Sequence, residues 1–174
     1  MNQSYDRLKA RQRAERETHS EGLALRVHRA LSWLNRAEQC DDDDGRFIFL
    51  WISFNAAYAQ QFSLEEQSPE KQKAEAFITK LVTLDSGNRL YDLLWSTFPG
   101  TLRVLLDNHY VFQPFWEAKG RGDDDGLWKA AFAGANRAAR SALGRGDTAT
   151  VLSVVLKRLY TLRNQLVHGG ATWN

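Results

Sequence analysis

Residues 159–170 read Leu-Tyr-Thr-Leu-Arg-Asn-Gln-Leu-Val-His-Gly-Gly, and they end the last helix that the sequence predicts. Apolar residues recur here, and in the turns before, at the three- and four-residue spacing of a helix with one buried face. They are Leu152, Val155, Leu159, Leu162 and Leu166. Gly169 and Gly170 predict the helix stop, because glycine readily adopts the left-handed conformation that ends helices.

Three polar residues, Arg163, Asn164 and His168, interrupt this apolar stripe. At about 100° per residue, Arg163 and His168 lie roughly 140° apart around the helix, with Asn164 one turn before His168. A guanidinium binds phosphoryl oxygens, an imidazole transfers protons and an amide orients either one, so the set suits phosphate-ester chemistry. The negative end of the helix dipole also favours the protonated imidazole. The spacing alone does not exclude a structural interpretation, a terminal helix with an interface arginine and a capping histidine.

The segment from Arg46 to Phe62 is apolar on every side of a helix, and such a helix belongs in the middle of a bundle. Asn55 is its polar exception. A buried amide must find a hydrogen-bond partner or cost about 1–3 kcal/mol, so Asn55 is expected to have one. The nearest candidate is a neighbouring backbone group.

Two segments resemble HEPN domains. Arg163-Asn164-x-x-x-His168-Gly169 resembles the R-x(4–6)-H signature on the last helix of that family, and residues 47–58 are similar to the second-helix segment of Apea-like and other prokaryotic HEPN proteins. The resemblance spans residues 20–174. It implies an all-α, up-and-down bundle of about five to six helices, with Arg163 and His168 as catalytic residues. It also implies that Asn164 and Asn55 support this pair, with Asn55 facing the last helix.

The same resemblance implies a metal-independent endoribonuclease that uses no cofactor and acts in a toxin–antitoxin or phage-defence setting. The 2′-OH of RNA is the nucleophile, so the site needs only proton transfer and charge stabilisation. One motif supplies one histidine, and the resemblance implies a homodimer that brings two Arg/His sets together. The alternative is a non-catalytic HEPN-like module that binds RNA, a nucleotide or a protein.

The resemblance also implies control by an antitoxin or another regulatory protein. The chain departs from the family pattern at one position that bears on this control. Some HEPN toxins carry a tyrosine two residues after the histidine, and a partner nucleotidyltransferase modifies it. Gly170 stands there in this chain. The departure argues against that form of control and leaves another regulator open.

The charge distribution points to a polyanionic partner such as RNA. The net charge is only +2, but residues 127–174 contain seven Lys or Arg and one acid. Lys157 and Arg158 are expected to contact RNA from this basic half. Charge alone would also fit ordinary solvated helix faces.

The chain is expected to contain one helical domain, residues 20–174, preceded by a basic extension, residues 1–19, that forms a frayed helix or a mobile arm. The acidic run 41–44 is expected to be a solvated turn. The aromatic segment 110–116 fits a loop that plugs the bundle, a base-stacking platform or a dimer contact. No apolar run could span a bilayer, and a single cysteine, Cys40, fits a reducing compartment, so we expect a cytoplasmic protein without a membrane partner.

Overall fold

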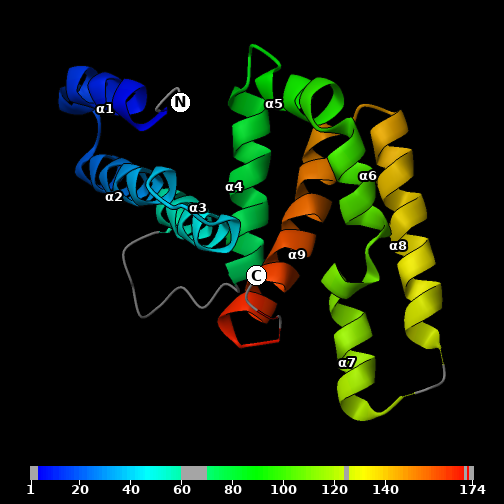
Figure 1. Ribbon diagram of the computed structural model, residues 1–174. Helices are drawn as coiled ribbons and strands as arrows, with labels where there is room; N and C mark the ends of the chain where they lie inside the picture. The colour runs from blue at the N-terminus through cyan, green and yellow to red at the C-terminus, as the bar shows by residue number, and fades with distance from the viewer. Residues whose placement is uncertain (1–3, 60–69, 124–125, 171, 173–174) are drawn as a thin grey trace. The chain divides into compact units, whose positions relative to one another are not determined.

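The computed structural model describes residues 4–59, 70–123, 126–170 and 172, and in these residues the chain forms nine α-helices and no strand (Figure 1). Short 3₁₀ or π turns, η1 to η3, connect some of them. The predicted all-helical fold is confirmed for this part of the chain. The helices belong to two compact units, residues 1–74 and residues 75–172.

The first unit is a helical hairpin with a third helix packed on it. Its helices are α1 (Ser4–Glu15), α2 (Glu21–Glu38) and α3 (Asp43–Tyr58), with η1 (Arg16–Thr18) after α1. Trp33 of α2 stacks on Phe49 of α3 with ring centroids 5.8 Å apart. The Ser53 hydroxyl donates to the Ala30 carbonyl at 2.7 Å, which fixes the register of the two helices.

Helix α1 shows that the described part of the basic extension packs against the rest of this unit. The Tyr5 backbone N–H donates to both carboxylate oxygens of Glu38, at 3.2 and 3.3 Å. Gln12 is buried, and its side-chain oxygen accepts from Lys9 Nζ at 2.7 Å. Residues 4–19 thus form a docked helix and a 3₁₀ turn, and the boundary between the two units falls much later than residue 19.

The acidic run 41–44 starts α3, which corrects the expectation of a solvated turn. Asp42 is the N-cap residue, and its side chain accepts from the Gly45 backbone N–H at 2.5 Å. Asp43 and Asp44 occupy the first turn, where negative charge interacts favourably with the helix dipole. The run therefore acts as a helix-initiation signal.

The nine α-helices of the described residues exceed the five to six that the sequence predicted, and the second unit contains most of them. The helices of the second unit are α4 (Glu70–Leu84, which includes the unit boundary), α5 (Arg89–Asp92), α6 (Pro99–Asp107), α7 (Gln113–Arg121), α8 (Leu127–Gly144) and α9 (Thr148–Val167), with η2 (Leu93–Thr97) and η3 (His109–Val111) between them. Pro99 and Pro114 lie in the first turns of α6 and α7, because proline suits a helix start but breaks a helix interior. The region between α4 and α8 is therefore divided into short pieces.

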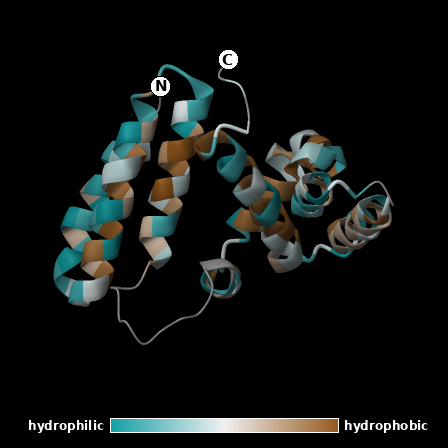
Figure 2. Cartoon of the chain, turned by 90° about the horizontal axis from the view of Figure 1, so that it is seen from below, coloured by the Kyte–Doolittle hydropathy of each residue, from teal (hydrophilic) through white to brown (hydrophobic). Residues whose placement is uncertain are grey.

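A core cluster of the second unit contains four buried residues from η2, α6, α8 and α9. They are Leu94, Leu102, Ala142 and Val151. Trp95 packs against this core, and its indole N–H donates to the Leu143 carbonyl at 3.1 Å. The ribbons carry apolar turns beside polar ones, as expected for amphipathic helices (Figure 2). Among the described helices, none combines the length and apolarity needed to cross a membrane.

Candidate functional site

The candidate site lies at the carboxyl end of α9, the helix that packs against α6, α8 and η3 in the second unit (Figure 1). The helix starts at Asp147, whose Oδ1 accepts from the Thr150 backbone N–H at 3.0 Å. This hydrogen bond is the largest cause of a lowered Asp147 pKa, and Arg145 adds to it. Asp147 is thus the N-cap residue of α9.

The two glycines after α9 end it as predicted. Gly169 has a φ of +70°, in the left-handed region, and the Gly170 N–H donates back to the Gln165 carbonyl at 2.7 Å. The His168 N–H donates to the Asn164 carbonyl at 3.0 Å, so His168 is the C-cap residue. These bonds satisfy carbonyls that a helix end would otherwise leave without donors.

The structure places Arg163, Asn164 and His168 within the last two turns of α9 and the residue that caps it. His168 is exposed to solvent, whereas Arg163 and Asn164 are half-buried. The guanidinium carbon of Arg163 lies 4.7 Å from the centroid of the Tyr160 ring, in a cation–π contact. The end of α9 therefore carries an imidazole that solvent can reach and a guanidinium that contacts the Tyr160 ring.

Tyr110 of η3 lies beside this helix end. The Gln165 side-chain amide donates to the Tyr110 carbonyl, and the Trp116 indole N–H donates to the same oxygen at 2.6 Å. Val111 is buried, but Tyr110 is 54% exposed. Segment 110–116 ends η3 and starts α7, so it is largely helical and is not the loop that the sequence suggested.

Arg158 is buried, with only 3% of its surface exposed. Its guanidinium carbon lies 4.5 Å from the centroid of the Phe112 ring and 5.1 Å from that of Phe132, and Nη2 donates to Asn136 Oδ1 at 3.1 Å. Burial lowers the pKa of Arg158. In this position Arg158 contributes to packing and offers a phosphate little surface.

Lys157, the other predicted RNA contact, forms an ion pair with Glu75 of α4 at 2.8 Å. Its side chain remains about half exposed. A solvated pair of this kind contributes little to stability and exchanges readily with other ions. An RNA contact at Lys157 stays a prediction.

Asn55 has a local partner in α3. Its side-chain Oδ1 accepts from the Tyr58 hydroxyl at 2.8 Å, and its backbone carbonyl accepts from the Ala59 N–H. Asn55 belongs to the first unit, and Arg163 and His168 belong to the second. The expected support of Arg163 and His168 by Asn55 therefore stays a prediction.

No protein-family model matches the chain, and neither a curated protein nor a solved structure is significantly similar to it. The candidate function is therefore argued from the residues of α9 and their surroundings.

Proposed function

We propose that this protein is a metal-independent endoribonuclease of the HEPN type that acts in a toxin–antitoxin or phage-defence setting. The observation that supports the proposal is the solvent-exposed His168 imidazole at the end of α9, with Arg163 and Asn164 in the turns before it. An exposed imidazole can exchange protons with a substrate, and a neighbouring guanidinium can bind the phosphate oxygens. Asn164 is placed to orient the phosphate or the imidazole.

The proposed reaction is cleavage of RNA by its own 2′-OH. The His168 imidazole accepts the 2′-OH proton, the 2′ oxygen bonds to the adjacent phosphorus, and the bond from phosphorus to the 5′ oxygen breaks. The leaving 5′ oxygen receives a proton from a second imidazolium. Arg163 stabilises the charge that develops on the phosphoryl oxygens. The products are a 2′,3′-cyclic phosphate and a 5′-OH.

The second imidazolium is supplied, in this proposal, by the partner subunit's His168 in a homodimer. Val167, directly before His168, is an apolar residue with 54% of its surface exposed. A two-fold contact buries the same patch on both subunits, so a contact through Val167 would bring the two copies of the site together. The dimer thereby provides separate groups for accepting and donating the proton.

Two features of the second unit favour RNA as the substrate. Residues 127–174 carry a local excess of six positive charges, which attracts a polyanion. Tyr110 presents an exposed ring beside Gln165, three residues before His168, and an aromatic ring of this kind can stack on an unpaired base. A single-stranded segment is therefore the preferred substrate of the proposed enzyme.

The test is cleavage of a mixture of single-stranded RNAs by the purified wild-type protein and by His168→Ala. General acid–base catalysis contributes about 100-fold or more, so His168→Ala is expected to reduce the cleavage rate by at least that factor. Arg163→Ala should reduce it similarly. His28→Ala, a substitution of an exposed histidine on α2, is the matched control and should leave the rate unchanged. Product analysis should find cyclic phosphate ends.

Other outcomes distinguish the alternatives. If the wild-type protein binds RNA but leaves it intact, the nuclease proposal is wrong and the protein is a module that binds RNA, a nucleotide or a protein. Neither binding nor cleavage would leave a structural helical protein. Equal cleavage by wild type and His168→Ala would trace the activity to another site or to a contaminant.

A further inference from the structure

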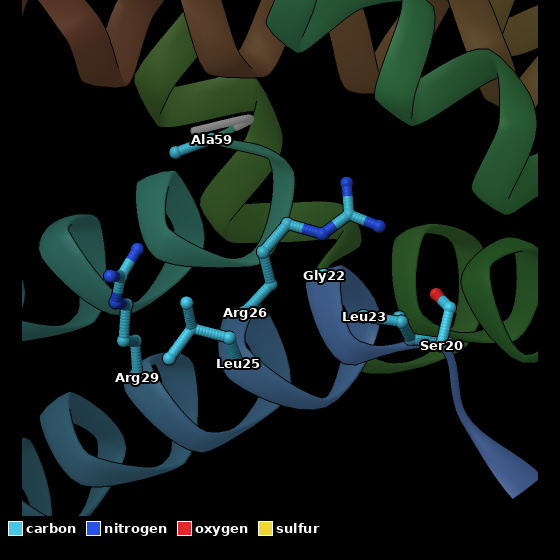
Figure 3. Close-up of a pocket in the computed structure, with 7 residues that line it drawn as sticks. All are labelled: Ser20, Gly22, Leu23, Leu25, Arg26, Arg29 and Ala59. Carbon is cyan, nitrogen blue, oxygen red and sulfur yellow. The ribbon is translucent and has the colours of Figure 1, made fainter. Parts of the chain in front are cut away.

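The first unit contains a pocket of about 230 Å³ at the amino end of α2 (Figure 3). Its lining residues come from α2, from Ser20 just before it, and from Ala59, which follows α3. They are Ser20, Gly22, Leu23, Leu25, Arg26, Arg29 and Ala59. One water occupies about 30 Å³ of liquid, so the pocket has room for a phosphate group and part of a molecule attached to it.

The pocket follows from the sequence of the hairpin. The contacts from Trp33 to Phe49 and from Ala30 to Ser53 show that α2 and α3 run in opposite directions, so the end of α3 lies opposite the start of α2. At the first of these contacts, the aromatic rings of Trp33 and Phe49 fill the space between the two helices. Alanines stand at positions 56, 57 and 59 near the end of α3 and fill much less volume. Of these alanines, Ala59 lines the pocket, and Arg26 and Arg29 both extend toward the side on which it lies (Figure 3).

The pocket contains two guanidinium groups, those of Arg26 and Arg29 on α2. Among the described residues, neither Arg26 nor Arg29 has a hydrogen-bond acceptor or a carboxylate in reach, and Arg26 Nε is buried as well. Arg36, further along the same helix, is different because it lies over the Phe49 ring at 4.8 Å. A buried N–H without an acceptor is unfavourable, and an anion would remove that penalty.

We propose that this pocket binds the phosphate group of a small phosphate ester. The Arg26 guanidinium, whose buried Nε has no acceptor, can bind two oxygens of the phosphate in a forked geometry. Arg29, one turn further along α2, extends on the other side of Leu25 and adds positive charge to the pocket (Figure 3). The Ser20 side chain makes no capping hydrogen bond and can donate to a third oxygen. The apolar wall of Leu23, Leu25 and Ala59 then contacts the organic part of the ester. This site is independent of the nuclease proposed at α9.

The test measures binding to the full-length protein by calorimetry, with inorganic phosphate, adenosine 5′-monophosphate and adenosine as ligands at constant ionic strength. The two phosphates should bind and raise the unfolding temperature, and adenosine should not. Tighter binding of the monophosphate identifies an ester as the ligand, and equal binding identifies free phosphate. If neither phosphate binds, or if potassium chloride produces the same rise in unfolding temperature, the proposal fails.

Two variants remove the site in different ways. Arg26→Met should weaken phosphate binding by about tenfold to hundredfold, as expected for the loss of charged hydrogen bonds. Without phosphate, Arg26→Met should unfold at the wild-type temperature or above it, because a buried N–H without an acceptor is gone. Ala59→Leu fills the pocket with both arginines intact and should weaken binding as well. Arg13→Met, at an exposed position of α1, is the control. Unchanged phosphate binding in Arg26→Met and Ala59→Leu would overturn the assignment.

Discussion

The charge of Arg158 suggested a contact with RNA, whereas its buried surroundings indicate a role in packing. The side chain fills the space between two phenylalanine rings, and its long aliphatic part packs as an apolar group would. The desolvation of a buried cation opposes the cation–π contacts, so packing is expected to dominate its effect on stability.

Variants at position 158 separate packing from charge. Arg158→Ala leaves unfilled space beside Phe112 and Phe132 and is expected to lower the free energy of unfolding by about 2–4 kcal/mol. Arg158→Met keeps most of the volume, and its loss should be under about 1.5 kcal/mol. Urea unfolding measures both, with the exposed Arg137→Ala as the control, expected within about 0.5 kcal/mol of wild type. Equal losses for Ala and Met would show that charge is the dominant contribution.

Asp147 makes the stability of α9 depend on pH. The Thr150 N–H lowers the pKa of Asp147 in the folded protein, so the unfolded chain binds its proton more readily. The contribution is fully present above the ordinary carboxyl pKa of 3.8 and is lost as the pH falls through the folded value. Asparagine can cap a helix without this charge.

The prediction for Asp147→Asn is therefore a smaller loss of stability on acidification. Its free energy of unfolding should be below that of wild type at pH 7, and the difference should shrink as the pH falls below 3.8. Urea unfolding at several pH values measures this difference. Asp92→Asn on α5 is the control at an exposed carboxylate. A difference that stays constant with pH would refute the capping role of the charge.

At the scale of an element, the start of α3 depends on two residues together. A Cβ atom at position 45 would lie 2.9 Å from Asp42 Oδ2, so Gly45 is what allows the Asp42 carboxylate to reach the helix N–H. Alanine at this position would improve helix propensity by up to about 1 kcal/mol, but it would displace the cap.

A double-mutant cycle tests this coupling. Asp42→Ala should lower the free energy of unfolding by about 1 kcal/mol, and Gly45→Ala alone should bring no net gain. In the Asp42→Ala background, the same Gly45→Ala substitution should stabilise by about 1 kcal/mol. Gly134→Ala in α8, where a Cβ would meet only the end of Arg137 at 4.0 Å, is the control and should be independent of Asp42. An identical Gly45→Ala effect in both backgrounds would exclude the coupling.

How far the sequence predicted each element depended on which signal defined it. The glycines after α9 are a local signal, and the end of that helix was predicted from them. The short helix α7 has too few turns to show an apolar period, and its first residues were assigned to a loop because they contain a proline among aromatic residues. The acidic run was assigned to a loop because four adjacent carboxylates suit a loop as well as a helix start.

The candidate sites show the same limit. Arg163, Asn164 and His168 were located by spacing on one helix, and in the structure they lie in the last turns of α9 and at its cap. Arg158 is seven residues after Val151 and four before Leu162, which places it in the buried stripe, but its charge was given more weight than its position. The Arg26 and Arg29 pocket could not be predicted from the sequence, since it depends on how α2 lies against Ala59, the residue that follows α3.

At the scale of the whole molecule, the proposed nuclease requires two chains. The protein is expected to have twice its chain mass of 19.9 kDa by light scattering, and its activity per chain should rise with concentration. Val167→Glu places a charge in the proposed contact and should produce a monomer with little activity. Val104→Glu, at a position of α6 that is 72% exposed, is the matched control. A fully active monomer would contradict the composite site.

The Tyr110 carbonyl accepts hydrogen bonds from both Trp116 and Gln165, so one oxygen links η3 to α7 and to α9. Either donor alone leaves that acceptor satisfied. The junction is therefore redundant: a lineage can lose one of the two side chains by neutral drift and still keep the loop beside α9. Over evolutionary time, a substitution of either Trp116 or Gln165 alone should therefore be tolerated more often than substitution of both.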